Sequence, residues 1–169
     1  MNLLNKPFCE NGNYLCTWDL QEKIALKLNI AGENIPVKQR NALTDSMLFG
    51  ENSLYHVVPK EYLGGIYFLI DDGWDVPFGT NTHKSKAPFG SLILDSEKFR
   101  GYGDTPAERL KTLNQKVKAM GYAGLGLWIS PQIPFENQNT TMEDHRNHWC
   151  ERAKWCQDAG VRYWKIDWG

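Results

Sequence analysis

The sequence predicts an α/β protein built on a parallel sheet, and three observations indicate this. Residues 66–70 are apolar at every position, as in a strand buried on both faces. Two segments, 105–121 and about 141–159, carry helical signatures and alternate with strand-like runs. Acidic and aromatic residues follow the strand-like runs, and parallel α/β sheets keep their sites at the carboxyl ends of the strands.

The N-terminal third gives weaker signals. An apolar and aromatic run predicts a first strand at about residues 14–19. Residues 22–65 contain glycine, asparagine and proline breakers, and only short helical turns are expected, at about 44–49 and after Pro59.

The second strand is expected at 66–72, with two adjacent aspartates at its end. Neighbouring strand residues point to opposite faces, so Asp71 and Asp72 can reach one ligand only if the turn at Gly73 swings one of them inward. The loop that follows, 75–103, is too long for a simple connector, and loops of this length tend to be functional.

The helix at 105–121 is the clearest element. Thr105 is a predicted N-cap, Pro106 fits the first helical position, and Glu108 completes a capping box. Its apolar stripe consists of Leu110, Leu113, Val117 and Met120, and Gly121 is the predicted stop. A second helix is expected from about Thr141 to Ala159, with Trp149, Ala153 and Cys156 on its apolar side and Gly160 as its stop.

The third strand, 124–130, alternates leucine or isoleucine on one face with Gly124, Gly126, Trp128 and Ser130 on the other. The small residues on that face are expected to make room for bulky neighbours such as those of the last strand. These glycines line a strand and do not follow one, so they do not form a phosphate-binding loop.

The last strand, 161–167, carries the strongest functional signal. Lys165 and Asp167 are two positions apart and therefore share one face. At ~4 Å and an effective dielectric of about 20, their attraction is on the order of 4 kcal/mol, which favours an ionised aspartate. A held carboxylate of this kind is a candidate nucleophile, although an ordinary ion pair at a strand end is the open alternative.

Composition narrows the range of partners. The chain has 169 residues, 41% of them hydrophobic, and a formal net charge of -1, so neither nucleic acid nor an anionic membrane surface is expected as a partner. No long apolar run suggests a membrane span or a signal peptide, and a cytoplasmic protein is expected. Its many aromatic rings suit sugar faces, although most such rings in proteins belong to the core.

Neither cysteines nor histidines predict a metal or disulfide site. Cys150 and Cys156 are six positions apart in a predicted helix, so they are expected to be free thiols, as are Cys9 and Cys16. A metal site at the histidine pair of "EDHRNHWC" is the minor alternative, because no standard zinc pattern completes it. No metal and no cofactor are expected.

Three motifs together resemble a known enzyme family. "IDDGW", "KAMGYAGLGLWISP" and "YWKIDWG", in this order between 66 and 169, are similar to the catalytic (β/α)8 TIM barrel of the α-galactosidase-type glycoside hydrolases, families twenty-seven and thirty-six, also called melibiases. The resemblance implies a glycoside or oligosaccharide substrate. It implies that Asp167 is the catalytic nucleophile, and that Asp71, Asp72, Trp74, Trp128 and Lys165 bind the substrate. Trp18 aligns poorly with an aromatic residue of the family's first strand.

Three departures from the family qualify this reading. Gly73 and the final "WG" stand where many members of family twenty-seven have cysteine, and Gln132 stands within what is usually Glu-Pro-Glu in family thirty-six, which leaves the sugar open. A whole eightfold barrel needs about 250 residues, so residues 1–169 are expected to hold only the first four strands, without the acid/base aspartate of a later strand. The chain as given is then expected to be inactive.

The predicted function is therefore that of a fragment of a retaining glycoside hydrolase that acts on α-galactosides or related α-glycosides through a covalent glycosyl-aspartate. The alternative is a non-catalytic carbohydrate-binding or degenerate barrel protein. The oligomeric state is left open by the sequence.

Overall fold

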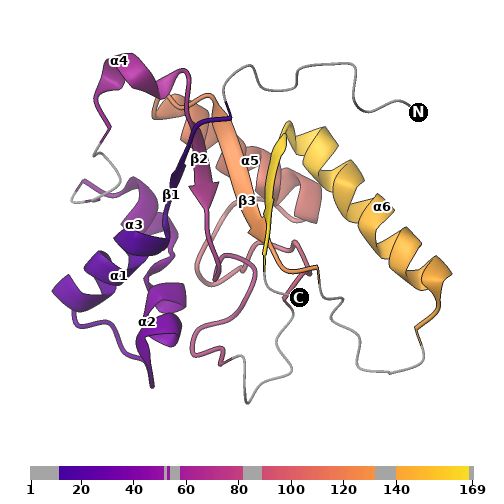
Figure 1. The fold of residues 1–169 in the computed structure, drawn as a ribbon, viewed down its shortest axis with the longest axis horizontal. Helices are drawn as coiled ribbons and strands as arrows, with labels where there is room; N and C mark the ends of the chain where they lie inside the picture. Colours follow the sequence, from indigo (N-terminus) through magenta and orange to yellow (C-terminus); the bar gives the residue numbers. More distant parts are fainter. Residues whose placement is uncertain (1–11, 52, 54–57, 82–88, 132–139, 168–169) are drawn as a thin grey trace.

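Four parallel strands form one sheet in the order β1-β2-β3-β4 in the computed structural model, which describes residues 12–51, 53, 58–81, 89–131 and 140–167. The strands alternate with helices along the chain (Figure 1). The strands are β1 (Tyr14–Cys16), β2 (Tyr67–Ile70), β3 (Gly124–Ile129) and β4 (Tyr163–Ile166). The predicted α/β class with a parallel sheet is confirmed.

The register of the sheet explains the glycines of β3. Gly126 pairs with Leu69 on one side and with Tyr163 on the other. A Cβ atom at this position would lie 3.0 Å from Leu69 Cδ1 and 3.1 Å from Tyr163 Cδ1. Glycine is therefore needed here because its neighbours already fill the space, as the sequence predicted.

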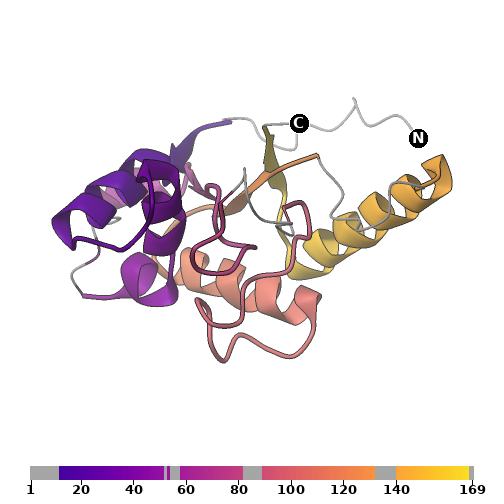
Figure 2. The same ribbon diagram turned by 90° about the horizontal axis from the view of Figure 1, so that it is seen from below.

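Helices α5 (Pro106–Ala119) and α6 (Met142–Ala159) lie on one face of the sheet (Figure 2). The predicted capping box of α5 is present, with Thr105 accepting a hydrogen bond from the backbone N–H of Glu108. Thr141 caps α6 in the same way, and Gly160 ends it with a φ of 71°, a conformation that favours glycine. On the predicted apolar side of α6, Cys156 is buried but Ala153 is exposed.

The main hydrophobic core lies between these helices and the sheet and extends to α1, α2 and α3, which contribute Leu20, Ile24, Ala42 and Leu48. From β2 and β3 it receives Phe68, Ile70, Leu125, Leu127 and Ile129, all buried. The helices and the segments that precede the strands contribute, among others, Leu110, Leu113, Val117, Tyr122, Cys156, Ala159 and Val161. Burial at about 25 cal/mol per Å² of apolar surface is what holds the helices on this face.

The opposite face of the sheet carries an aromatic cluster. The ring of Tyr163 lies 5.5 Å from that of Tyr14 and 5.7 Å from that of Tyr67, measured between centroids. Tyr14 is 46% exposed, so this face is less covered than the helical one. Lys165, two residues after Tyr163, and Asp71, four residues after Tyr67, follow on the same face.

The first third of the chain differs most from prediction. The first strand ends at Cys16, not at about residue 19, because α1 (Trp18–Lys27) begins there. A second unpredicted helix, α2 (Ile35–Ala42), starts after the Asn34 cap. The expected turns are present as α3 (Asp45–Phe49) and α4 (Lys60–Leu63).

The other strands are shorter than predicted, by one to three residues. β2 ends at Ile70, before both aspartates, and β4 begins only at Tyr163. Within the described part of the chain, no helix is long and apolar enough to cross a membrane.

Candidate functional site

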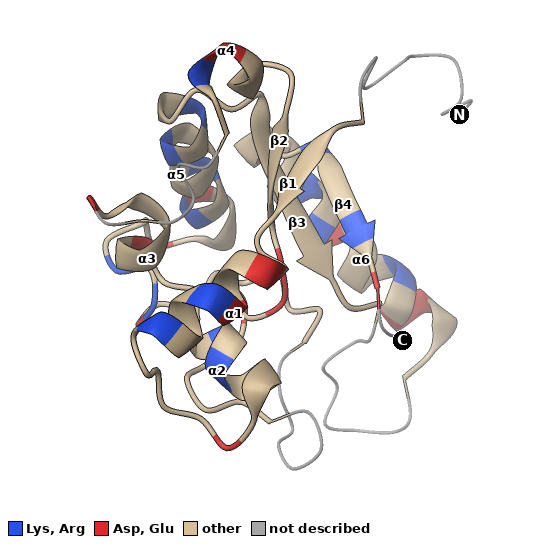
Figure 3. Cartoon of the chain, turned by 60° about the vertical axis from the view of Figure 1, so that its left-hand side comes forward, with Lys and Arg blue, Asp and Glu red and all other residues tan. Residues whose placement is uncertain are grey.

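Three of the predicted site residues meet at the carboxyl ends of β2 and β4. The ammonium group of Lys165 lies 2.8 Å from Oδ2 of Asp71 and 3.6 Å from Oδ2 of Asp167. Figure 3 shows acidic segments just beyond the ends of these two strands, with a basic segment in β4. The lysine thus bridges a carboxylate of the second strand and one of the fourth.

The sheet register brings these groups together. Lys165 pairs with Trp128 of β3, and Asp71 follows Ile70, the last residue of β2. Asp71 and Lys165 therefore flank β3 at the same level, and the four-carbon stem of the lysine spans the gap. Asp167 continues the ladder past β4, because its backbone N–H donates to the carbonyl of Ile129 at 3.1 Å.

The carboxylate of Asp71 is buried and accepts hydrogen bonds from three donors. The residue is only 3% exposed. Besides the ammonium group of Lys165, its carboxylate accepts hydrogen bonds from the thiol of Cys16 at 3.0 Å and from the backbone N–H of Asp72 at 2.9 Å. Its own N–H donates to Oγ1 of Thr17 at 2.9 Å. A buried carboxylate with three donors is well stabilised and fixed in orientation.

The thiol of Cys16 acts as a donor in this arrangement. Burial raises its pKa to about 11, and the hydrogen bond to Asp71 and the charge of that carboxylate add to the rise. Cys16 therefore stays protonated at neutral pH and is a poor nucleophile.

Lys165 stays charged, and Asp167 is the accessible carboxylate of the site. Burial lowers the pKa of Lys165, but the hydrogen bond and charge of Asp71 outweigh this effect, and the pKa lies above its ordinary value. The side chain of Asp167 is 54% exposed, against 4% for that of Asp71. Chemically, the site offers one exposed carboxylate beside a fixed ammonium group, so Asp167 is the group placed to attack or bind a ligand.

Asp72 points away from this group, toward α2. Oδ2 of Asp72 accepts hydrogen bonds from Nε of Arg40 at 2.8 Å and lies 2.6 Å from Nη2 of the same guanidinium. Gly73 turns the chain with a φ of 118°, but the turn does not direct Asp72 to Lys165. The two aspartates therefore have different neighbours, and the structure brings only Asp71 to the lysine.

Both predicted tryptophans lie in the packed interior. Trp74 is fully buried, and its indole N–H donates to the backbone carbonyl of Trp128 at 2.9 Å. Trp128 is 3% exposed and belongs to a small cluster with Val76 and Phe89. In the described part of the chain these rings support the strand ends, and a direct ligand contact by either stays a prediction.

Sequence reasoning missed a buried ionic group behind the turn after β2. It consists of Arg40, Asp72, Asp75 and Lys98. The ammonium group of Lys98 donates to three backbone carbonyls, those of Arg40, Gly73 and Val76, at 2.7–3.2 Å. No local pattern marks Arg40 or Lys98, because their partners lie far away in the sequence. Cys16 could have been found, since alternation along the first strand places it on the face of Tyr14.

The alternative metal site receives no support from the geometry. Nε2 of His148 lies 3.0 Å from the carbonyl of Gly90, and Nε2 of His145 lies 3.2 Å from Oγ1 of Thr140. Among the described residues there is no group of three or more side chains that could hold a metal ion. Cys16, Cys150 and Cys156 are free thiols, and Cys9 lies outside the described residues.

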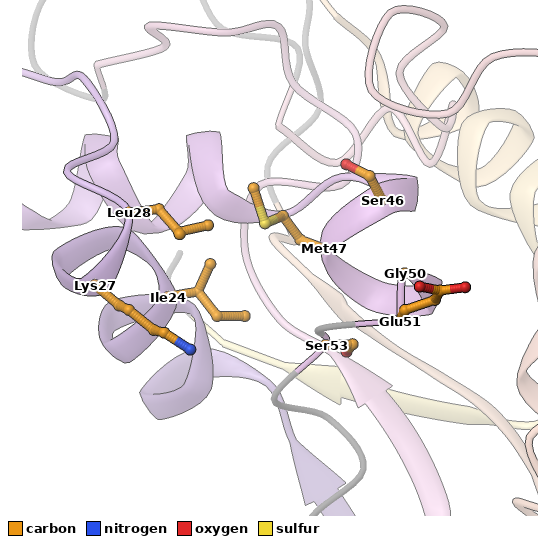
Figure 4. A pocket seen from close by; sticks show the side chains of 8 residues that line it. All are labelled: Ile24, Lys27, Leu28, Ser46, Met47, Gly50, Glu51 and Ser53. Atoms are coloured by element: carbon orange, nitrogen blue, oxygen red, sulfur yellow. The ribbon is translucent and has the colours of Figure 1, made fainter.

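A cavity of about 180 Å³ lies between α1 and α3 (Figure 4). Its lining contains none of the predicted site residues and consists of Ile24, Lys27, Leu28, Ser46, Met47, Gly50, Glu51 and Ser53. The candidate site is therefore defined by its charged groups and not by this cavity.

No protein-family model, curated protein or solved structure significantly matches this chain.

Proposed function

We propose that this chain is part of the (β/α)8 barrel of a retaining glycoside hydrolase that acts on α-galactosides or related α-glycosides. The four parallel strands would be the first four of the barrel. The single observation that carries the proposal is the bridge made by Lys165 between Asp71 and Asp167, because it gathers the ends of two of the three family-like motifs at one site.

Each of the three residues has a distinct role in this proposal. Asp167 attacks the anomeric carbon and forms the covalent glycosyl-enzyme. Its side chain is accessible enough to do so. Lys165 lies beside this carboxylate and donates to a substrate hydroxyl. Asp71, buried and held by three donors, fixes the lysine and supplies an acceptor at the edge of the site.

A second candidate is a protein that binds carbohydrate without cleaving it. One observation favours it: Asp71 is the carboxylate nearest to the lysine, but its contacts and its 3% exposure leave it no freedom to act as a general acid. A retaining enzyme needs a second carboxyl group about 5 to 5.5 Å from the nucleophile. In the first candidate that group comes from a later strand, and in the second it does not exist.

Covalent labelling of the full-length protein separates the two candidates. A 2-deoxy-2-fluoro α-galactosyl fluoride should inactivate the enzyme and add one sugar to Asp167, as read by mass spectrometry of the peptide around β4. Labelling of Asp71 or Asp72 would contradict the role of Asp167. Binding of the sugar without labelling or turnover would favour the binding protein.

The sugar preference is tested by a panel of aryl α-glycosides on the same protein. A clear preference for α-galactosides is expected from the motif resemblance. Preference for the α-glucoside would contradict the predicted substrate but not the mechanism.

A further inference from the structure

The hydroxyl group of Thr17 lies at the centre of a buried chain of hydrogen bonds. Thr17 follows β1 directly and is fully buried. Its Oγ1 accepts a hydrogen bond from the backbone N–H of Asp71 at 2.9 Å and donates one to Oε1 of Gln21, in α1, at 2.6 Å. A hydroxyl has a single proton, so both contacts can be made at once only in this direction. Thr17 therefore links the aspartate after β2 to α1.

Gln21 extends the chain to the turn after β2 and to α2. It is fully buried, and its amide nitrogen donates to the backbone carbonyls of Asp72 at 3.0 Å and of Gln39 at 3.1 Å. Both protons of the amide are used in this way, and its oxygen accepts from Thr17. The N–H of Asp71 and the carbonyl of Asp72 are thus tied to the same helix, and a buried network whose members are paired in this way is rigid.

The end of β1 also contacts the carboxylate of Asp71. The thiol of Cys16, the residue before Thr17, donates to Oδ2 of Asp71 at 3.0 Å. The same oxygen lies 2.8 Å from the ammonium group of Lys165. Two consecutive residues of the chain therefore hold Asp71, one by its carboxylate and one by its backbone N–H.

We propose that Thr17 is a positioning residue of the site: its hydroxyl anchors Asp71 to α1 and thereby sets where Lys165 is held beside Asp167. Thr17 is fully buried and acts only through Asp71. The consequence for catalysis rests on the proposed function and deepens it, because it gives α1 a role in the site. The anchoring of Asp71 is itself testable without a substrate.

Loss of the Thr17 hydroxyl would disturb this arrangement. It would leave the N–H of Asp71 and Oε1 of Gln21 buried without their partner, a cost that the turn after β2 can lower by shifting. Lys165 lies 2.8 Å from Asp71 and 3.6 Å from Asp167, so a shift of Asp71 also moves the ammonium group relative to Asp167. A reactive site needs its groups within about 0.5 Å of their productive positions.

Cys16 reports the position of Asp71 in the absence of any ligand. Burial raises the pKa of its thiol, and the hydrogen bond and the charge of Asp71 add to the rise, to about 11. The backbone of Trp18 and the charge of Lys165 act in the opposite direction. If the carboxylate of Asp71 moves away, the pKa of Cys16 should fall, and more of the thiol should be ionised at a given pH. Cys16 is half-buried, so a small alkylating reagent can reach it.

The test compares Thr17→Val, which removes the hydroxyl at nearly constant volume, with Thr17→Ser, which keeps it. Alkylation of the full-length protein by iodoacetamide is followed at mildly alkaline pH by mass spectrometry of the peptides. The rate rises with the thiolate fraction, although a thiolate of lower pKa is somewhat less nucleophilic. Cys16 should therefore react about two- to fourfold faster in Thr17→Val and at the wild-type rate in Thr17→Ser. Gln21→Met removes the next link, should show the same increase, and decides the question if Thr17→Val does not fold.

Two other thiols and one further variant serve as controls. Cys150 is exposed and Cys156 is buried, so their rates in the same sample report the reagent and any loosening of the fold, and neither should change. Thr105→Val removes a hydroxyl that caps α5 and should leave the rate of Cys16 unchanged. An unchanged rate of Cys16 in Thr17→Val, an equal rise at Cys156, or an equal rise in Thr17→Ser or Thr105→Val would overturn the role of Thr17.

The catalytic readout separates this inference from the proposed function. With an aryl α-galactoside, Thr17→Val should lower kcat of the full-length protein about tenfold with a smaller change in KM, because the reacting groups are displaced, and Thr17→Ser should restore it. Faster alkylation of Cys16 with a normal kcat would overturn the positioning role in catalysis. Failure of the wild type to bind or hydrolyse any α-glycoside, together with faster alkylation in Thr17→Val, would overturn the proposed function but not the anchoring of Asp71 by Thr17.

Discussion

The ends of β2 and β4 carry the two carboxylates that meet at Lys165, but they are built differently. At the end of β2, Asp71 is buried and held by a lysine, a thiol and a backbone N–H, and Asp72 is braced by Arg40. At the end of β4, Asp167 has one backbone hydrogen bond into the sheet and one loose ion pair, and its side chain is 54% exposed. One carboxylate is therefore a fixed support, and the other is the more accessible group of the site.

The strands themselves show the same contrast. β2 lies between two strands, and Phe68, Leu69 and Ile70 are fully buried. β4 pairs only with β3 among the described strands, and Ile166 is 66% exposed. An edge strand with an exposed apolar residue is a surface that further structure or another chain can cover.

The sharpest test of the contrast is Asp167→Asn. If Asp167 is the reactive carboxylate, hydrolysis of an aryl α-galactoside by the full-length protein should fall on the order of a thousandfold or more. The unfolding midpoint should hardly change, because the side chain is exposed. Asp158→Asn is a suitable control, since among the described residues Asp158 forms an exposed ion pair with Lys154. Near-normal turnover in the Asp167 variant would contradict the assignment of Asp167 as the nucleophile.

Replacing an apolar side chain with alanine should lower the free energy of unfolding much more in β2 than in β4. Phe68→Ala in β2 should lower the free energy of unfolding by about 3–5 kcal/mol, because it leaves a cavity in a fully buried region. Ile166→Ala in β4 should cost less than about 1 kcal/mol, since most of the side chain already meets solvent. Chemical denaturation measures both values. Equal losses would mean that β4 is covered by structure outside the described residues.

The buried ionic group behind β2 predicts a pH dependence of the protein's stability. Burial, with the charge of Asp72, raises the pKa of Asp75 from 3.8 to about 7. The folded protein then holds this proton more tightly than the unfolded chain, so the stability that Asp75 contributes is present at acid pH and lost as the pH rises from about 4 to about 7.

Asp75→Asn should remove this loss, which is on the order of a few kcal/mol at most. The variant should therefore gain stability relative to wild type as the pH rises from 4 to 7, as followed by urea unfolding at several pH values. Asp104→Asn, at an exposed position, is the control, and its free energy of unfolding should depend on pH in the same way as that of the wild type. A parallel curve for the Asp75 variant would show that this carboxyl is ionised in the fold.

A further effect on stability is expected in β3, the strand that lies between β2 and β4. Gly126→Ala should cost about 1–3 kcal/mol, because the new methyl group meets Leu69 and Tyr163 at about the closest distance that real contacts reach. Gly124→Ala is the matched control, since its nearest contacts would be ordinary ones at 3.5 Å. Equal thermal midpoints for the two variants would show that the aromatic cluster can shift to make room.

Local sequence patterns were sufficient for the central and C-terminal elements. The caps and stripe of α5, the Thr141 and Gly160 ends of α6, and the alternation of β3 all follow from interactions within a few residues. The face shared by Lys165 and Asp167 follows from the period of a strand in the same way. These features depend on interactions between residues that are close in the sequence, so they can be predicted from the sequence alone.

The same reasoning failed for α1 and α2, for a physical reason. On α1 a polar residue, Gln21, is fully buried, where its amide donates to the backbone carbonyls of Gln39 and Asp72. On α2 the buried set likewise includes a glutamine and Arg40. These polar residues interrupt the apolar stripes of the two helices, which otherwise consist of Leu20, Ile24 and Ala25 on α1 and Val37 and Ala42 on α2, and so weaken the pattern on which prediction depends.

By itself, the sequence determined the parallel α/β alternation and the pairing of a lysine with an aspartate on the last strand, since both arise from short-range periodicity. Only the tertiary structure decided which carboxylate the lysine holds most closely. The ammonium group of Lys165 lies closer to Asp71, which is 94 residues away in the sequence, than to Asp167, which is two residues away. The tertiary structure also turned Asp72 toward Arg40 of a helix that the sequence did not reveal. Such contacts depend on how the strands and helices pack, and they cannot be predicted from the spacing of residues along the chain.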